Sequence, residues 1–157
     1  MSARQRFSVL LMCAIPLVSM HAQVTSKLQG AWQLQSQKID GKIQTIRGIR
    51  LRILSAKHFV WVNQDRQRLE ELLARHTAHD SAVAYHDDCG AGTWMVNGDV
   101  YTETTEVFYD PGNIGTSIDW KFHLDGDLWY TSGHYIHYKN GKKDEDLLLE
   151  EVWKRLD

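Results

Sequence analysis

The stretch that most constrains the fold runs from residue 90 to residue 103, and it has the pattern of a strand, a tight turn and a second strand. Asn97-Gly98 supplies two residues that tolerate positive φ, which a two-residue hairpin turn requires. With this loop, Val96 would pair with Asp99. Side chains alternate along a strand with period two, so one face should carry a defined set of residues. That set is Trp94, Val96, Tyr101, Glu103 and Thr105.

Short β-prone segments punctuated by turn residues fill the rest of the chain after residue 28. The expected strands span 30–40, 43–54, 57–62, 82 up to the hairpin, 100–109, 117–124, 128–138 and 147–156. One segment has a different character: helix formers and leucines at helical spacing (Leu69, Leu72 and Leu73) predict a single helix within residues 66–78. It would either close one end of the fold or contact a partner.

About eight strands joined mostly by short turns predict an all-β fold, either a sandwich or an up-and-down antiparallel barrel. We favour the barrel, with one short helical insertion. A barrel of eight strands can hold one small ligand inside.

The first residues have the features of a secretory signal. Arg4 and Arg6 precede an apolar run from residue 7 to residue 20, and Ala22 follows as a small residue before the expected cleavage point. We therefore expect residues 1–22 to be a signal peptide and residues 23–157 to be one domain, secreted or periplasmic. Cleavage would change the formal net charge from −2 to −4, because it removes two arginines.

Composition excludes several classes of function. No basic run indicates nucleic-acid binding, and no later apolar run approaches the length of a membrane span. Cys89 would be the one cysteine left after cleavage, so it cannot form an internal disulfide. A half-buried structural cysteine is the expectation there, with a reactive thiol as the alternative.

Both ends of the chain carry a recognisable signature. Gly30-Ala31-Trp32 matches the G-x-W of the first strand in lipocalins and their calycin relatives, and the chain ends in Glu151-Val152-Trp153-Lys154-Arg155. In that superfamily a basic residue of the last strand packs across this tryptophan, so Arg155 is the expected partner of Trp32. An indole face attracts a guanidinium, and pairing of the terminal strands would abolish open edges.

More specifically, the chain resembles a bacterial lipocalin-like family of secreted or periplasmic proteins. The shared elements are Lys57-x-Phe59-x-Trp61, Gly92-Thr93-Trp94, Gly98-x-x-Tyr101-x-Glu103, and Glu151-x-Trp153-x-Arg155. The resemblance implies the barrel fold and covers the predicted domain except residues 65–88. It implies neither a particular ligand nor an activity.

Glu103 is the sharpest candidate for a binding residue, because an inward carboxylate is unfavourable without a partner. It would anchor a polar or cationic group of a ligand; alternatively, it pairs with a lysine or arginine inside the barrel or faces solvent. The aromatic residues would fill the core, line the pocket, or do both. The candidate ligand-binding residues are Trp61, Trp94, Tyr101, Glu103, Trp120, Tyr130 and His134.

Tyr130 and His134 depend on the register across Asp125-Gly126. A two-residue loop would place Trp129, Thr131 and Tyr135 on the face of Phe122. A loop with a bulge would place Tyr130, Ser132 and His134 there instead, and this second register is the one we favour.

Neither a metal site nor a catalytic site is indicated. His134 and His137 lie three apart on a strand and so face opposite sides, and no third ligand joins His76 and His79. Gly90-Ala91-Gly92 lacks the features of a phosphate loop and is better explained as a bend in a strand at a barrel corner. Glu103 and Glu106 would also face opposite sides, so an acid–base pair is not indicated. We expect no cofactor.

The sequence therefore predicts a binding protein whose interior takes a small apolar or amphipathic ligand. Two alternatives remain open: a barrel enzyme of the isomerase or hydratase type with Glu103 as base, or a filled barrel that acts on a protein partner, for example as an inhibitor.

Overall fold

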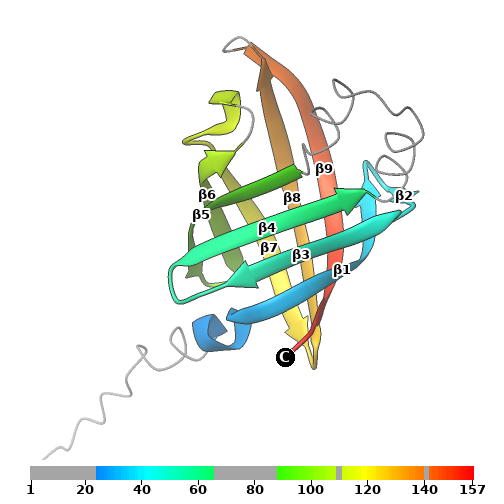
Figure 1. Ribbon diagram of the computed structural model, residues 1–157, viewed down its shortest axis with the longest axis vertical. Coiled ribbons are helices and arrows are strands. Elements are labelled where there is room, and N and C mark those ends of the chain that lie inside the picture. The colour runs from blue at the N-terminus through cyan, green and yellow to red at the C-terminus, as the bar shows by residue number, and fades with distance from the viewer. Residues whose placement is uncertain (1–23, 66–87, 109–110, 140–141) are drawn as a thin grey trace, which may run out of the picture.

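The computed structural model describes residues 24–65, 88–108, 111–139 and 142–157. Within them a helical turn at residues 24–28 is followed by nine strands and one 3-10 helix. These are β1 (Gly30–Ile39), β2 (Lys42–Gln44), β3 (Gly48–Leu54), β4 (His58–Asp65), β5 (Asp88–Asn97), β6 (Val100–Phe108), η1 (Pro111–Asn113), β7 (Ser117–Asp125), β8 (Leu128–Lys139) and β9 (Lys142–Arg155) (Figure 1).

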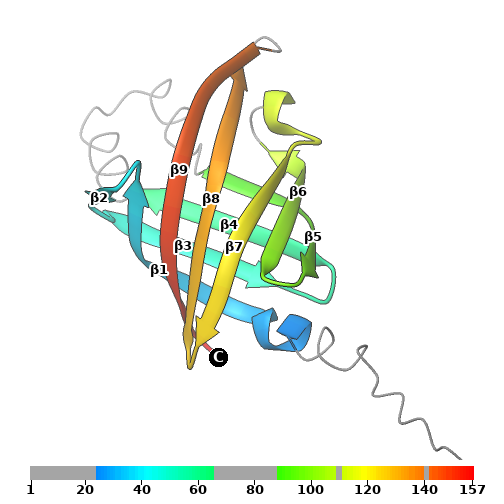
Figure 2. The ribbon, with the colours of Figure 1, turned by 180° about the vertical axis from the view of Figure 1, so that it is seen from behind.

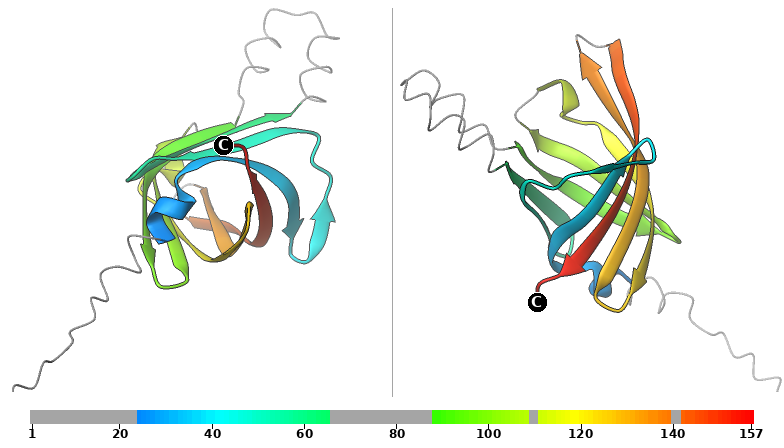
Figure 3. Two further views of the ribbon diagram at one scale, coloured as in Figure 1. Left: turned by 90° about the horizontal axis from the view of Figure 1, so that it is seen from below. Right: turned by 90° about the vertical axis from the view of Figure 1, so that its right-hand side faces the viewer.

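The strands form one antiparallel sheet that closes on itself. Each strand from β3 to β9 pairs with the next, and β1 pairs with both β3 and β9. The short β2 adds to the far half of β1, so eight strands make the ring, which is visible end-on in Figure 3. The predicted all-β, up-and-down antiparallel barrel is confirmed. The predicted helix within residues 66–78 and the predicted signal at residues 1–22 lie outside the described residues.

Two strand boundaries differ from the expectation. The segment expected as one strand over 43–54 is divided into β2 and β3. The last strand begins at Lys142 rather than at residue 147, because β8 and β9 pair along their whole length, from Leu128 opposite Lys154 to Lys139 opposite Lys142. The two strands form a long ribbon that rises above the others (Figures 1 and 2).

The barrel closes where β1 meets β9. Trp32 and Arg155 are paired in the register, and the Arg155 guanidinium lies 4.3 Å from the centroid of the Trp32 ring. Arg155 Nη1 also donates to the carbonyl of Gln29 at 2.8 Å. A Cβ at Gly30 would lie 2.6 Å from Arg155 Nη1, and Gly30 has φ 129°. The expected partnership of Trp32 with Arg155 is confirmed, and it explains the glycine two residues before the tryptophan.

The β5–β6 hairpin has its turn one residue later than expected. The two loop residues are Gly98 and Asp99, Asn97 pairs with Val100, and Val96 pairs with Tyr101 instead of Asp99. Gly98 has φ 65° in the first loop position, as a type II′ turn requires. The partner of Val96 is thus two residues further along than predicted. Because a shift by an even number of residues keeps each side chain on its own face, Trp94, Tyr101 and Glu103 still share one face, as predicted.

A bulge in β6 bends this hairpin further along. Gly92 pairs with Thr105 and Ala91 with Val107, so Glu106 is the extra residue. A Cβ at Gly92 would overlap the carbonyl oxygen of Thr104, which explains why glycine stands there. The segment Gly90-Ala91-Gly92, where a bend was expected, lies opposite this bulge of β6.

An apolar core fills the end of the barrel beside the helical turn of residues 24–28, which is the lower end in the view of Figure 1. Leu28, from the helical turn, is fully buried beneath it and accepts a hydrogen bond of 2.8 Å from Trp32 Nε1. Trp129 is central: its ring lies 5.4 Å from that of Trp32 and 5.3 Å from that of Tyr101. The buried members are Leu28, Trp32, Leu34, Leu54, Phe59, Trp94, Tyr101, Trp120, Trp129 and Trp153. This aromatic floor is continuous, so the lower end is sealed.

The outer face carries Cys89, which is a free thiol and exposed. The expectation of a half-buried cysteine is wrong, because Cys89 pairs with Val62 on a part of β4 and β5 that faces outward. None of the helical segments in the described ranges is both long and apolar enough to span a membrane.

Loss of the closing contact should weaken the fold. Arg155→Ala removes the guanidinium from Trp32 and from the Gln29 carbonyl, and we expect it to lower the free energy of unfolding by about 2 kcal/mol. Lys154→Ala, at the exposed neighbour on the same strand, should change it by less than about 0.5 kcal/mol. Urea unfolding monitored by tryptophan fluorescence measures both, and equal effects would contradict the role of Arg155.

Candidate functional site

A cavity of about 370 Å³ lies above the aromatic floor. Seven strands, β1, β3, β4 and β6 to β9, contribute to its lining, and the apolar lining residues include Trp61, Phe108, Trp120, Leu149 and Trp153. This volume is within the lower range of pockets that hold small molecules, about 300–1,000 Å³. The interior of the barrel is therefore divided into a filled lower part and a hollow upper part.

Two bulges decide which side chains reach this cavity. In β1, Leu34 pairs with Trp153 and Ser36 with Val152, so one extra residue reverses the alternation and turns Gln37 and Ile39 inward. In β6, the extra Glu106 has the same effect and turns Phe108 inward. Strict alternation from the floor would have pointed different residues into the cavity.

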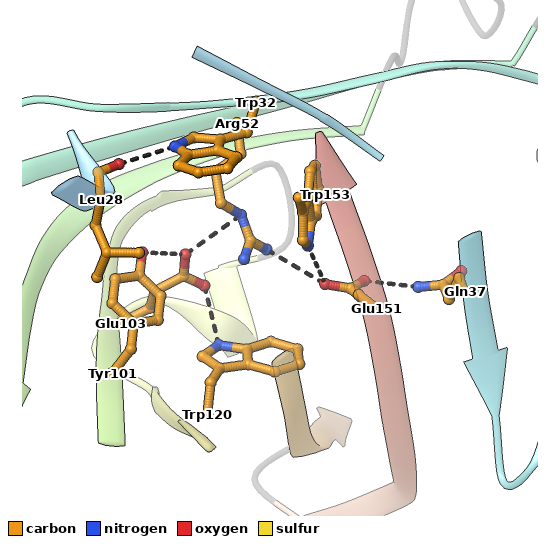
Figure 4. Close-up of polar contacts among 9 residues, drawn as sticks. All are labelled: Leu28, Trp32, Gln37, Arg52, Tyr101, Glu103, Trp120, Glu151 and Trp153. Carbon is orange, nitrogen blue, oxygen red and sulfur yellow. Dashed lines mark hydrogen bonds and ion pairs between the residues drawn. The ribbon is translucent and has the colours of Figure 1, made fainter. Parts of the chain in front are cut away.

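A layer of buried charge separates the floor from the cavity, and Arg52 of β3 is at its centre (Figure 4). Arg52 Nε lies 3.4 Å from Glu103 Oε1, and Nη2 lies 3.9 Å from Glu151 Oε2. The guanidinium also lies over the ring of Trp153, 4.5 Å from its centroid. One guanidinium and two carboxyl groups thus share a buried space walled by indole rings.

Glu103, on β6, is bound on both carboxylate oxygens. Oε1 accepts a hydrogen bond of 2.6 Å from the Tyr101 hydroxyl, and Oε2 accepts one of 3.3 Å from Trp120 Nε1. Burial raises the pKa of Glu103 above its ordinary value, while Arg52 and the Tyr101 hydroxyl act in the opposite direction. The alternative in which Glu103 pairs with an arginine inside the barrel is the one the structure contains.

Glu151, on β9, connects this layer to the rim of the cavity. Its Oε2 accepts from Trp153 Nε1 at 3.1 Å, and its Oε1 accepts from Gln37 Nε2 at 2.8 Å. Gln37 Oε1 in turn accepts from Arg50 Nη1 at 2.7 Å. Burial disfavours the charged form of Arg52, but Glu103 and Glu151 more than offset this, so the pKa of Arg52 lies above its ordinary value.

Two buried side chains on the cavity wall have polar atoms without a hydrogen-bond partner among the described residues. In Arg52 these are Nε and Nη1, and in Asn113, on η1, they are Oδ1 and Nδ2. Both residues line the cavity, and only 6% of Arg52 and 3% of Asn113 is exposed. Buried polar groups are nearly always hydrogen-bonded, so these four atoms are exceptions, and each of them is itself inaccessible to solvent.

Of the predicted binding residues, Trp61, Glu103 and Trp120 line the cavity. Trp94 and Tyr101 do point inward, but they belong to the aromatic floor, where their rings lie 5.5 Å apart. Trp94 Nε1 donates to the Ser55 carbonyl at 3.0 Å. These two residues therefore close the lower end beneath the cavity.

The favoured register across Asp125-Gly126 is wrong. Phe122 pairs with Thr131 and Asp125 with Leu128, so the loop has two residues and no bulge. Tyr130 and His134 consequently lie on the outer face: the Tyr130 ring stacks on that of His123 at 4.4 Å, and His134 Nδ1 lies 2.9 Å from Asp146 Oδ1. Trp129 and Tyr135 take the inward positions instead.

Arg52, Gln37 and Asn113 line the cavity but were not among the predicted binding residues. Arg52 lies between Leu51 and Ile53, and two apolar neighbours on one face indicate that the arginine is the outward residue. The structure reverses this, with Ile53 50% exposed and Arg52 buried. Arg52 and Leu54 are two residues apart and therefore face the same side of β3, and Leu54 is 2% exposed. The apolar residue at position 54 was thus the available sign that Arg52 faces inward. The inward direction of Gln37 could be predicted only by knowing that β1 contains a bulge between Leu34 and Ser36.

No group of three metal-ligating side chains occurs in the part of the chain that the structure describes. The carboxylates of Glu103 and Glu106 face opposite sides, and Glu106 Oε1 accepts from the Thr93 hydroxyl on the outer face at 3.2 Å.

Fold and site together define a closed, eight-stranded antiparallel barrel with a sealed floor and an upper cavity. No family model matches this sequence, and no curated protein sequence matches it. Among solved structures, the fold is similar to that of an uncharacterized protein from Bacteroides eggerthii DSM 20697, with a TM-score of 0.48 and 12% identity over 82% of this chain and 98% of that chain.

Removal of the central cation should be strongly destabilising. Arg52→Met leaves Glu103 and Glu151 buried without their cation, and we expect a loss of about 3–5 kcal/mol in the free energy of unfolding. Adding Glu103→Gln should restore part of that loss. The matched control is Arg50→Met, which changes a half-buried arginine of the same strand. Urea unfolding measures both variants. An equal loss in the free energy of unfolding for Arg50→Met and Arg52→Met would contradict the assignment.

Glu103 should also give stability a characteristic dependence on pH. Its pKa is raised above the ordinary 4.5, so the folded protein binds this proton more tightly than the unfolded chain does. The contribution of Glu103 to the free energy of unfolding therefore increases as pH falls from above the raised pKa to 4.5, and it is constant below 4.5. The free energy of unfolding of the wild type minus that of Glu103→Gln should show this rise.

The control for this pH series is Glu106→Gln, which removes a carboxylate from the outer face of the same strand. Urea titrations at steps of pH measure both difference curves. If Glu106→Gln gave as large a rise as Glu103→Gln, burial of Glu103 could not be its cause.

Proposed function

We propose that this barrel binds one small, mostly apolar molecule in its upper cavity. The observation that carries the proposal is the 370 Å³ space between a sealed aromatic floor and the rim, lined by Trp61, Phe108, Trp120 and Trp153. Small-molecule sites are typically concave, mainly apolar and provided with a few polar groups that orient the ligand. The polar residues of the lining, which include Gln37, Arg50 and Thr105, would supply such groups here.

The free energy of binding would come mainly from apolar surface that leaves water. Each square ångström contributes about 25 cal/mol, less the cost of immobilising the ligand. Glu103 was expected to contact the ligand directly, but both of its oxygens are hydrogen-bonded within the protein. We therefore assign it a positioning role, because it holds Arg52 at the base of the cavity.

We also propose that the chain is a lipocalin-like protein of the calycin type that works after secretion or in the periplasm. The contact between Trp32 and Arg155 and the closed barrel support the first part. The basic, apolar and small-residue pattern of residues 1–22 supports the second part.

The two alternative functions have less support. An isomerase or hydratase would use Glu103 as its base, but Tyr101 and Trp120 already occupy that carboxylate. A filled barrel acting on a protein partner would have no internal space, and the cavity above the floor is a specific observation against it. The leucines at positions 69, 72 and 73, which favoured a partner, lie outside the described residues.

Native mass spectrometry of the full chain, purified without refolding, tests the proposal first. We expect a co-purifying adduct of one small molecule per chain, released by denaturation. The same preparation, stripped of that adduct, should bind the neutral fluorescent probe N-phenyl-1-naphthylamine with a stoichiometry of one. Failure of the stripped protein to bind the probe would overturn the proposal.

Filling the cavity should abolish this binding. Leu149 lines the cavity, and Leu149→Trp should weaken binding of N-phenyl-1-naphthylamine at least tenfold, because the added ring occupies the space for the ligand. Leu148→Trp is the matched control, since Leu148 pairs with the outward His134 on the other face of β9. Fluorescence titration measures both, and unchanged affinity in Leu149→Trp would exclude the cavity as the site.

A further inference from the structure

We propose that the molecule in the upper cavity is a carboxylic acid with an apolar body, and that its carboxylate binds the guanidinium of Arg50. The inference rests on the proposed function and names the chemical class of the ligand. It follows from a cation that is accessible on the cavity wall, from the uncharged groups that hold this cation in place, and from the carboxylates of the lining, which the protein itself occupies.

Arg50 lies on the cavity wall, on the same face of β3 as Arg52. Two residues along a strand span about 7 Å, so Arg50 lies roughly that much further from the aromatic floor than Arg52 does. Arg50 is half-buried, and none of its nitrogens is among the enclosed polar atoms without a partner. A molecule in the cavity can therefore reach this guanidinium.

More than half of the donors of Arg50 remain available. Its Nε donates to Asn63 Oδ1 at 3.0 Å, and its Nη1 donates to Gln37 Oε1 at 2.7 Å. A guanidinium has five N–H donors, so both hydrogens of Nη2 and one of Nη1 have no acceptor among the described residues. These three N–H groups lie on the part of the guanidinium where a carboxylate can bind.

The groups that hold Arg50 carry no charge. Both acceptors are side-chain amides, one from β1 and one from β4, and no carboxylate forms an ion pair with Arg50 within the described ranges of the chain. The amides orient the guanidinium without neutralising it. A planar guanidinium that is fixed in this way suits a carboxylate, which it can bind with two parallel hydrogen bonds.

The carboxylates of the lining, by contrast, are not available to a cationic ligand. Glu103 is 4% exposed and Glu151 is 6% exposed, and all four of their oxygens accept hydrogen bonds from protein side chains. Gln37 donates to Glu151 and accepts from Arg50, so its amide lies between the two charges; Figure 4 shows the first of these contacts. The accessible charge on the described cavity wall is therefore positive.

The orientation of the ligand follows from the same charges. Two carboxylates surround the single guanidinium of Arg52, and they would repel an anion at the base of the cavity. The acid group should therefore lie at Arg50, with the apolar body below it. The rings of Trp61 and Phe108, whose centroids are 5.6 Å apart, line the space for this body.

Three probes that share one ring system and differ in charge test the inference: 2-naphthylacetate, 2-naphthylacetamide and 2-(2-naphthyl)ethylammonium. The full chain, stripped of any adduct, is titrated calorimetrically with each of them at pH 7.5. We expect the acetate to bind at least tenfold more tightly than the other two, and added salt to reduce this advantage because a half-exposed ion pair is screened. Tightest binding of the acetamide or of the ammonium probe would overturn the inference.

Substitutions of Arg50 identify the source of the preference. In Arg50→Met, the advantage of the acetate over the acetamide should fall to within twofold, while the affinity for the acetamide stays within threefold of the wild type. Arg50→Lys keeps the charge and should retain an advantage of more than threefold. Lys38→Met removes a positive charge from the outer face and should preserve the tenfold advantage. If the advantage persisted in Arg50→Met, Arg50 could not be its source.

A second variant neutralises Arg50 without removing it. Asn63→Asp has nearly the same shape, and its carboxylate can accept the same hydrogen bond from Arg50 Nε. We expect the acetate to lose its advantage over the acetamide in this variant. Gln64→Glu, at the exposed neighbour on β4, adds the same charge outside the cavity and should leave the advantage unchanged. A full tenfold advantage in Asn63→Asp would overturn the inference even if Arg50→Met failed to fold.

Two further outcomes separate the inference from the function beneath it. Equal affinity for the acetate and the acetamide in the wild type would overturn the inference, since water would then serve Arg50, but it would leave the binding function intact. If none of the three probes bound, and N-phenyl-1-naphthylamine did not bind either, the proposed function itself would fail.

Discussion

The buried guanidinium of Arg52 is the feature on which the interior of this barrel depends. Three ionised side chains away from water are costly, and their mutual attraction offsets that cost only when the remaining hydrogen bonds are made. Here Tyr101, Trp120, Gln37 and Trp153 each donate to one of the two carboxylates. The layer therefore fixes the positions of residues from five different strands. It also stops the aromatic floor from extending upward, because no apolar ring can replace a paired charge without leaving its partners unsatisfied.

The two ends of the barrel have different physical characters for this reason. Below the charged layer, Leu28, Trp32 and Trp129 pack with full burial, and the contact of Arg155 with Trp32 holds the first and last strands together. Above it, side chains line a space and do not fill it. Close packing of side chains is therefore concentrated at the closed end, while the other end holds the cavity.

Local sequence rules predicted most of the architecture. Turn residues and period-two alternation were sufficient for the strands, the barrel and the inward face of Trp94, Tyr101 and Glu103. The closing pair followed from the resemblance at the chain ends. The register at Asp125-Gly126 could not be derived in this way, since a loop longer by one residue exchanges every side chain of β8 between faces, and both loops suit the same turn residues. Arg52 was missed because a buried cation is recognised only by its partners, which come from distant strands.

The bulges in β1 and β6 have a consequence for how such a barrel changes in evolution. Each is a single extra residue, near Leu34–Ser36 in one strand and at Glu106 in the other. Deleting Gln35, which lies between the paired residues Leu34 and Ser36, would restore regular alternation and leave Ser36 outward and Gln37 inward. A bulge thus absorbs one residue without turning over the rest of its strand, so β1 or β6 can lose that residue while the side chains that line the upper cavity stay the same.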